Sequence, residues 1–123
     1  MYQISIKSNF SAAHNLRDYK GKCENLHGHN WNVEVSVESD ILNKEGMVVD
    51  FIELKRIVKD LLDNLDHKYI NEIEPFDKLN PTSENLSCYI FKGISDKLKE
   101  SSIIVKRVDV WETKSSRASY YEW

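Results

Sequence analysis

Apolar and polar side chains alternate in two stretches in the first third of the chain. In the second stretch, every second position after His29 is apolar: Trp31, Val33, Val35 and Val37. In the first, residues 2–14, most apolar positions share one parity, and His14 continues it. Because alternate side chains of a strand point to the same face, the pattern predicts strands over residues 2–14 and 27–38, each with one buried face.

The middle of the chain changes to helical spacing. Asp50, followed by Glu53, predicts the capped start of a helix. Apolar residues then recur at intervals of three and four, and we expect this helix to end near Asp66 and His67. The run Asn80-Pro81-Thr82-Ser83-Glu84 predicts a second helix start, with Thr82 or Ser83 as its cap.

The last quarter predicts a third strand over residues 103–113 and a short fourth strand over 118–123. The element order is then strand, strand, helix, helix, strand, strand. This order is typical of an α+β fold in which two helices pack on one face of a four-stranded antiparallel sheet.

Bulk properties fit a single domain covering residues 1–123. The composition, 41% hydrophobic and 30% charged, is that of an ordinary globular protein. A net charge of −3 argues against a general nucleic-acid binder. We expect no membrane association, since no apolar run reaches spanning length and the start is too polar for a secretory signal. The two cysteines, Cys23 and Cys88, predict free thiols and a cytoplasmic location.

Three of the four histidines fall on the predicted inward faces. His27 and His29 are separated by one glycine, and His14 ends the first strand. Three neutral imidazoles with one open coordination position match the ligand set of a catalytic zinc ion. The alternative is a group of core or turn histidines satisfied by hydrogen bonds.

Cys23 lies four residues before His27, in a loop that we expect to fold near the metal. A thiolate there would be favoured by nearby positive charge and could act as a base or nucleophile. Two alternatives stay open. The cysteine is a small loop hydrophobe, or it is a fourth zinc ligand that closes the site of a non-catalytic, zinc-stabilised binding module.

Two acidic positions complete the candidate chemistry. His67 beside Asp66 is either a partner of the helix dipole or a proton carrier oriented by its aspartate. Glu112 shares the inward parity of its predicted strand. Inside the protein its carboxylate would need partners, such as two N–H donors of a heterocyclic ring; the alternative is a solvated residue past the strand end.

Six segments of the chain, in this order, resemble the family of 6-pyruvoyl-tetrahydropterin synthases and queuosine-pathway 6-carboxy-tetrahydropterin synthases. The cluster of a cysteine and His-Gly-His is the most specific, and the segments span nearly the whole chain. They are Ala12-Ala13-His14, Cys23-Glu24-Asn25-Leu26-His27-Gly28-His29, Val49-Asp50-Phe51, Leu65-Asp66-His67, Asn80-Pro81-Thr82-Ser83-Glu84-Asn85 and Trp111-Glu112-Thr113.

The resemblance implies a tunnelling fold that assembles into a barrel, with pockets between subunits and a homo-hexamer favoured. It implies conversion of 7,8-dihydroneopterin triphosphate to 6-carboxy-5,6,7,8-tetrahydropterin, acetaldehyde and triphosphate. The residue roles implied are Zn²⁺ on His14, His27 and His29, Cys23 as general base, Asp66 and His67 as proton-relay partners, Glu112 as pterin anchor, and Thr82 and Ser83 lining the pterin pocket.

Glu24 leaves the reaction open. Family members that cleave dihydroneopterin substrates to 6-hydroxymethyl-dihydropterin carry a glutamate just ahead of the His-Gly-His motif, and this chain has both Cys23 and Glu24. Glu24 is either a solvated loop charge or a second acid–base group that redirects the cleavage. A 6-pyruvoyl-tetrahydropterin product is a further alternative.

Overall fold

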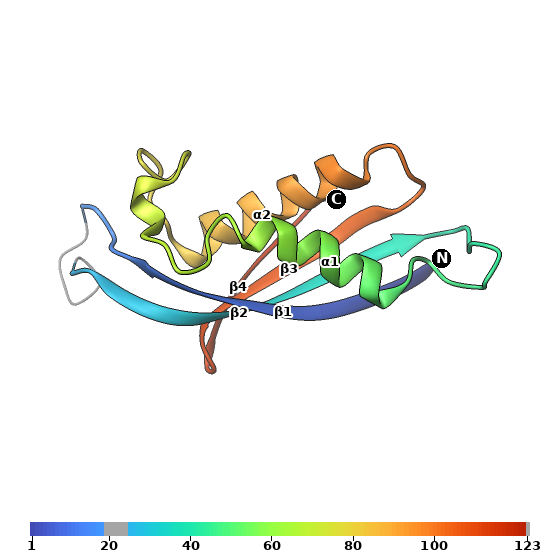
Figure 1. Ribbon diagram of the computed structural model, residues 1–123, viewed down its shortest axis with the longest axis horizontal. Coiled ribbons are helices and arrows are strands. Elements are labelled where there is room, and N and C mark those ends of the chain that lie inside the picture. Colours follow the sequence, from blue (N-terminus) through green and yellow to red (C-terminus); the bar gives the residue numbers. More distant parts are fainter. Residues whose placement is uncertain (19–24, 123) are drawn as a thin grey trace.

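The computed structural model describes residues 1–18 and 25–122, and it confirms the predicted α+β architecture (Figure 1). Four strands form one antiparallel sheet in the order β1-β2-β3-β4, and both helices lie over the same face of it. The elements are β1 (Tyr2–His14), β2 (His27–Ser39), α1 (Phe51–Leu62), the 3-10 turn η2 (Ile70–Glu72), α2 (Ser83–Leu98), β3 (Ile104–Thr113) and β4 (Ser116–Tyr121).

The predicted inward parity of β1 and β2 forms the sheet side of the core. Phe10 pairs with Trp31 across the two strands, and both side chains are almost fully buried. One step further along the same face, Ala12 pairs with His29, and His14 pairs with His27. The two histidine-bearing strand ends therefore meet side by side, at the end of the sheet opposite the N-terminus (Figure 1).

Both predicted helix caps are present. The carboxylate of Asp50 accepts a hydrogen bond from the backbone N–H of Ile52 at 2.7 Å. The hydroxyl of Thr82 accepts one from the N–H of Asn85 at 3.1 Å. Thr82, rather than Ser83, is thus the cap of α2. Each cap satisfies a backbone donor that has no partner inside its helix.

Two predicted boundaries were wrong. Helix α1 ends at Leu62, not near Asp66 and His67. Backbone bonds from Leu65 and Asp66 back to the carbonyl of Leu62 continue a turn beyond the helix, so apolar spacing persists and Leu65 is buried. Strand β4 is Ser116–Tyr121, two residues earlier than predicted, because it forms a tight hairpin directly after β3.

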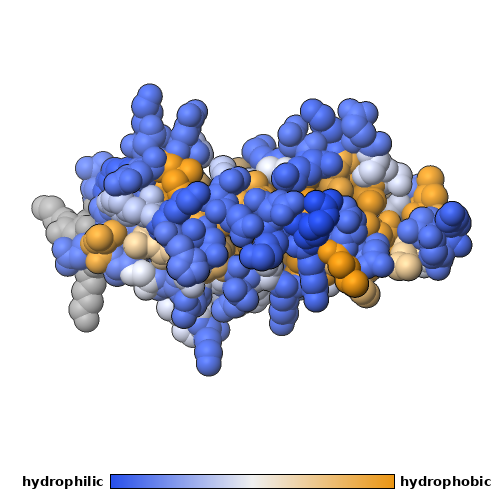
Figure 2. Space-filling model, in the orientation of Figure 1, coloured by the Kyte–Doolittle hydropathy of each residue, from blue (hydrophilic) through white to orange (hydrophobic). Residues whose placement is uncertain are grey.

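The outer surface is mainly hydrophilic in the view of Figure 2, but apolar side chains come to the surface at the end of the molecule where the N-terminus lies. Tyr2, Met47 and Phe51 line an open hollow at that end. Strands β1 and β4 are the two edges of the sheet. None of the described helices has the length and apolar character needed to cross a membrane.

Candidate metal centre and active site

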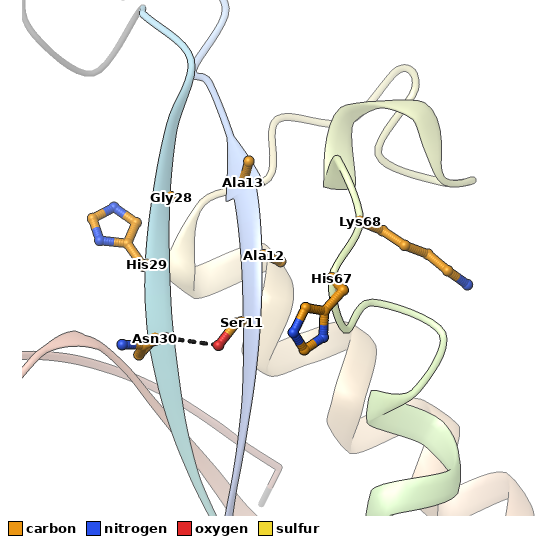
Figure 3. Close-up of a pocket in the computed structure, with 8 residues that line it drawn as sticks. All are labelled: Ser11, Ala12, Ala13, Gly28, His29, Asn30, His67 and Lys68. Carbon is orange, nitrogen blue, oxygen red and sulfur yellow. Dashed lines mark hydrogen bonds between the residues drawn. The ribbon is translucent and has the colours of Figure 1, made fainter.

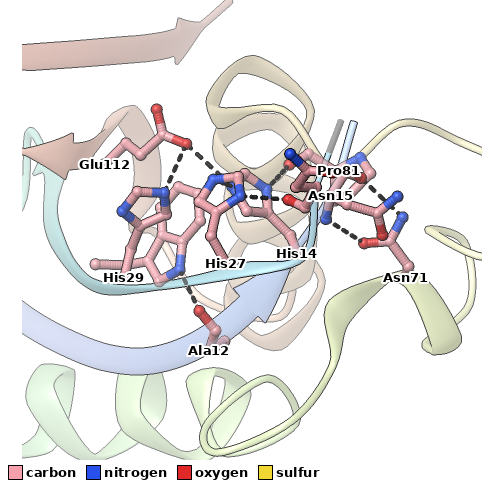
Figure 4. Close-up of polar contacts among 10 residues, drawn as sticks. Ala12, His14, Asn15, His27, His29, Asn71, Pro81 and Glu112 are labelled. Atoms are coloured by element: carbon pink, nitrogen blue, oxygen red, sulfur yellow. Dashed lines mark hydrogen bonds and ion pairs between the residues drawn. The ribbon is translucent and has the colours of Figure 1, made fainter. Parts of the chain in front are cut away.

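Three histidines converge where β1 ends and β2 begins (Figure 4). His14 is only 1% exposed, and the other two, His27 and His29, are partly buried. The indole of Trp31 packs edge-on beneath two of the rings, with centroids 4.9 Å from His14 and 5.2 Å from His29. The indole N–H donates to the carbonyl of Ala12 at 3.3 Å, and this bond holds the Trp31 ring against β1.

The ring nitrogens that face one another are the Nε2 atoms. Nε2 of His14 lies 3.1 Å from Nε2 of His27. A carboxylate oxygen of Glu112, Oε1, lies 3.1 Å from Nε2 of His14 and 3.2 Å from Nε2 of His29. One ligand atom from each of these four residues lies within 4.8 Å of the others. In a tetrahedral zinc site, two imidazole nitrogens are about 3.3 Å apart, so the spacing of the donors suits such an ion.

The hydrogen bonds of the rings are a second, independent indication of a cation at this site. Nδ1 of His14 lies 2.8 Å from the carbonyl oxygen of Pro81, and Nδ1 of His27 lies 2.7 Å from that of Asn25. A carbonyl oxygen only accepts, so both Nδ1 atoms carry the proton, and in the neutral rings both Nε2 atoms present lone pairs. Two lone pairs facing at 3.1 Å repel unless a cation lies between them.

The third ring adds an unsatisfied atom. Nε2 of His29 is buried and has no hydrogen-bond partner among the described residues. Its 3.2 Å approach to Glu112 lacks hydrogen-bond geometry. Buried polar atoms without a partner are rare in native proteins and point to a missing ion or water. The residues present therefore fit a metal ion, and nitrogen with carboxylate oxygen is a donor set that zinc accepts.

Burial favours the metal-binding, neutral form of two imidazoles, those of His14 and His29. Loss of solvation lowers the pKa of His14 below its ordinary value, against the opposing effects of the Pro81 carbonyl and Glu112. Loss of solvation also lowers the pKa of His29, again opposed by Glu112. Neutral rings at pH 7 are the state that can coordinate a metal.

Glu112 lies where its strand parity predicted, facing inward at the end of β3, with 29% of its side chain exposed. The structure thereby brings four of the predicted site residues together: His14, His27, His29 and Glu112. The role of Glu112 as a pterin anchor stays a prediction, because its carboxylate contacts the imidazoles of His14 and His29 in this structure.

Asp66 and His67 lie elsewhere. His67 is 82% exposed and flanks an open hollow of about 440 Å³, which is also lined by residues 11–13 of β1 and 28–30 of β2. In Figure 3, His67 and His29 lie on opposite sides of the β1–β2 pair. Asp66 accepts a hydrogen bond from the backbone N–H of Ser11 at 2.9 Å and lies 3.1 Å from Nδ1 of His67. These contacts, the one from Ser11 above all, lower the pKa of the Asp66 carboxyl.

His67 itself has a left-handed backbone, with φ of 58°. Its N–H donates to the carbonyl of Ser11, and the N–H of Ala13 donates to that of Lys68 at 3.0 Å. The segment after α1 is thus tied to the edge of β1, which fixes where the Asp66–His67 pair can point.

The remaining candidates are placed less fully. Cys23 and Glu24 lie outside the described residues. Thr82 and Ser83 are half-buried at the N-terminus of α2, with the Thr82 hydroxyl engaged as the helix cap. Sequence reasoning missed the carbonyl of Pro81 as a partner of His14, because backbone carbonyls carry no residue-type signal. Only the position of Pro81 in the run Asn80-Pro81-Thr82, ahead of a helix, marked that segment at all.

Comparison with known proteins agrees with this arrangement. The family model described as 6-pyruvoyl tetrahydropterin synthase matches residues 3–122. A 6-carboxy-5,6,7,8-tetrahydropterin synthase from Synechocystis is 39% identical over 98% of this chain and 94% of its own. A dihydroneopterin monophosphate aldolase from Pyrococcus furiosus is 36% identical over 89% of each chain.

A solved structure gives the same result at the level of the fold. The 6-pyruvoyl tetrahydropterin synthase of Caenorhabditis elegans superimposes with a TM-score of 0.88 at 29% identity, covering 99% of this chain and 96% of that one. The match extends over both helices and all four strands, since it leaves almost nothing uncovered. By its matched length, its relatives and its fold, the chain belongs to the 6-pyruvoyl tetrahydropterin synthase family.

Proposed function

We propose that this protein is a zinc-dependent lyase that converts 7,8-dihydroneopterin triphosphate to 6-carboxy-5,6,7,8-tetrahydropterin, acetaldehyde and triphosphate, a reaction of queuosine biosynthesis in the cytoplasm. The observation that carries the proposal is the convergence of the Nε2 atoms of three imidazoles, of which that of His29 is buried without a hydrogen-bond partner among the described residues. The Synechocystis relative, whose name is that activity, supports the choice of reaction.

His14, His27 and His29 would hold the zinc ion through Nε2. When bound, zinc supplies Lewis-acid polarisation to a hydroxyl of the substrate side chain. The protein's part is to fix the direction of the three rings. Pro81, Asn25 and Trp31 do this through their contacts with the rings.

Glu112 would serve the substrate. Its carboxylate lies at the rim of the metal centre and is partly exposed, so it can accept hydrogen bonds from a ligand that enters there. A heterocycle that presents two N–H donors would satisfy both of its oxygens. Thr82 and Ser83 would line the same pocket. They lie at the start of α2, directly after Pro81, whose carbonyl accepts the hydrogen bond of His14.

Proton transfer would fall to Cys23 and His67. Asp66 remains a carboxylate, because its pKa is lowered, and it favours the proton of His67 on Nδ1. The other ring nitrogen, Nε2, would then be free to exchange a proton with a substrate group. His67 faces away from its own metal centre (Figure 3), so it would act at the metal centre of a neighbouring subunit.

A homo-oligomer, with a hexamer favoured, is therefore part of the proposal. Strands β1 and β4 are the edges of the described sheet, and an edge strand can pair with a strand of a second copy. At its His14 end the edge of β1 is already bonded to residues 67–69. Exposed apolar side chains at Tyr2, Met47 and Phe51 lie at the end of the molecule near the start of β1. Both features favour association of copies of this chain.

A second reaction has its own support. The Pyrococcus furiosus relative is named a dihydroneopterin monophosphate aldolase, and Glu24 follows Cys23 directly in this sequence. With Glu24 as an additional acid–base group, the same metal centre would cleave a dihydroneopterin phosphate to 6-hydroxymethyl-dihydropterin.

Product analysis separates the two reactions. Zinc-loaded protein is incubated with 7,8-dihydroneopterin triphosphate, and the pterins are separated by chromatography and identified by mass. We expect the 6-carboxy product with acetaldehyde in equal amount. Release of 6-hydroxymethyl-dihydropterin without the carboxy product would establish the second reaction instead, and Glu24→Ala should then abolish it.

A closed, non-catalytic zinc site makes a different prediction. It would form neither product from 7,8-dihydroneopterin triphosphate, and X-ray absorption would find a sulfur about 2.3 Å from the metal.

A further inference from the structure

One short loop from outside the sheet contacts the metal centre. Residues 79–82 run between the 3-10 turn η2 and helix α2, and they lie beside the residues that follow β1. The carbonyl of Pro81 in this loop accepts the hydrogen bond of the His14 ring at 2.8 Å (Figure 4). The direction of His14 thus depends on where this loop is held.

The side chain of Asn80 holds it. Its Oδ1 accepts from the backbone N–H of Arg17 at 2.8 Å, and its Nδ2 donates to the carbonyl of Arg17 at 3.0 Å. The amide of Asn80 pairs with one residue in both directions, as a neighbouring strand would. This pairing joins the loop to the chain three residues after His14.

The backbone of Asn80 is fixed as well. Its carbonyl accepts from the N–H of Thr82 at 2.9 Å and from the side-chain amide of Asn85 at 2.8 Å. The guanidinium of Arg17 donates to the carbonyl of Leu79 at 3.3 Å, on the other side of Asn80. The peptide unit that precedes Pro81 is therefore held from α2, from within the loop and from the end of β1.

We propose that Asn80 is a positioning residue of the metal centre: by fixing the Pro81 carbonyl, it keeps the proton of His14 on Nδ1 and Nε2 free for the ion. This inference rests on the metal centre proposed above. Asn80 does not reach the cluster, and it acts on the metal only through Pro81 and His14. The group that directly orients a metal-ligating histidine, here the Pro81 carbonyl, typically contributes about 10- to 100-fold to metal affinity, which sets the upper limit for Asn80.

The test compares two asparagines that each bind backbone groups through their side chains. Asn80→Ala removes both bonds to Arg17. Asn43→Ala is the matched control, because Asn43 accepts from the N–H groups of Glu45 and Met47 in a turn at the other end of the molecule. Zinc affinity is measured by competition with a chromophoric chelator, and the protonated ring nitrogen of His14 is identified from long-range ¹H–¹⁵N spectra of the metal-free proteins.

We expect Asn80→Ala to weaken zinc binding measurably, by at most about 10- to 100-fold, and to mix the two tautomers of His14. Asn43→Ala should keep the affinity and the single Nδ1–H tautomer of the unchanged protein. If Asn80→Ala does not fold, Asn80→Asp serves in its place, since it keeps the acceptor, loses the donor and should shift both readouts in the same direction.

Two results would overturn the inference. One is an unchanged zinc affinity and tautomer in the Asn80 variant, even with lower stability. The other is an equal loss of affinity in Asn43→Ala, which would mean a general effect of stability. If the unchanged protein itself binds no zinc, the failure lies with the proposed metal centre and not with Asn80 alone.

Discussion

Replacing His14 by alanine tests the metal centre most directly. His14 is the most buried of the three rings and contacts the other two, with ring centroids 4.6 Å from His27 and 5.3 Å from His29. Without it, two imidazoles remain beside Glu112, whose carboxylate is assigned to the substrate, so the proposed three-histidine site loses one of its ligands. His67→Ala is the matched control, since it removes the one histidine that lies outside the cluster and is exposed.

Two magnitudes follow for this pair of variants. In metal-free protein, His14→Ala leaves the buried carbonyl of Pro81 without its donor, and an unsatisfied buried acceptor costs about 1–3 kcal/mol. In the presence of free zinc at roughly 1,000 times its Kd, binding stabilises the folded state by about 4 kcal/mol. For a domain of this size that corresponds to about 12–16 °C in Tm.

The assay is thermal unfolding of each protein with chelator and with buffered zinc. The unchanged protein and His67→Ala should both gain the full zinc-dependent shift. His14→Ala should start lower in chelator and gain almost nothing from zinc. A zinc-dependent rise of equal size in His14→Ala would refute the three-histidine site, whatever the stability of the metal-free form.

Three further predictions concern catalysis, substrate and pH. Cys23→Ala should retain stoichiometric zinc by elemental analysis but lose most turnover, and undiminished turnover would remove Cys23 from the mechanism. Glu112→Ala should keep the metal and weaken pterin binding in a calorimetric titration, and an equal dissociation constant would count against the anchor. Acidification from pH 7 to 5 should destabilise the metal-free protein. The pKa values of His14 and His29 are lowered in the folded state. The unfolded chain therefore takes up protons below about pH 6.5 that the folded chain does not. Urea unfolding at the two pH values measures this, and a difference that persists unchanged in His14→Gln would exclude His14 as a contributor.

Much of the fold could be predicted from local pattern. Two-residue alternation placed β1 and β2 and put His14, His27 and His29 on the face that packs against the helices. The caps at Asp50 and Thr82 marked both helix starts. These features depend on neighbours within a few residues, and such information is present in the sequence itself.

Other features depended on contacts between segments far apart in the chain. The end of α1 was misplaced because the turn after Leu62 keeps helical spacing and buries Leu65 without being helix. No sequence pattern predicted that the backbone of His67 would bond to the outer edge of β1, away from the cluster of His14, His27 and His29.

The sequence alone determined which residue types face inward and therefore that three imidazoles would need partners. The tertiary structure decided that their Nε2 atoms meet at the end of the β1–β2 pair, that Glu112 joins them from β3 and that Pro81 orients His14. The physical reason is that side-chain direction follows from the local repeat of a strand. Distances between ring nitrogens follow from strand register, sheet twist and a loop contact 67 residues along the chain.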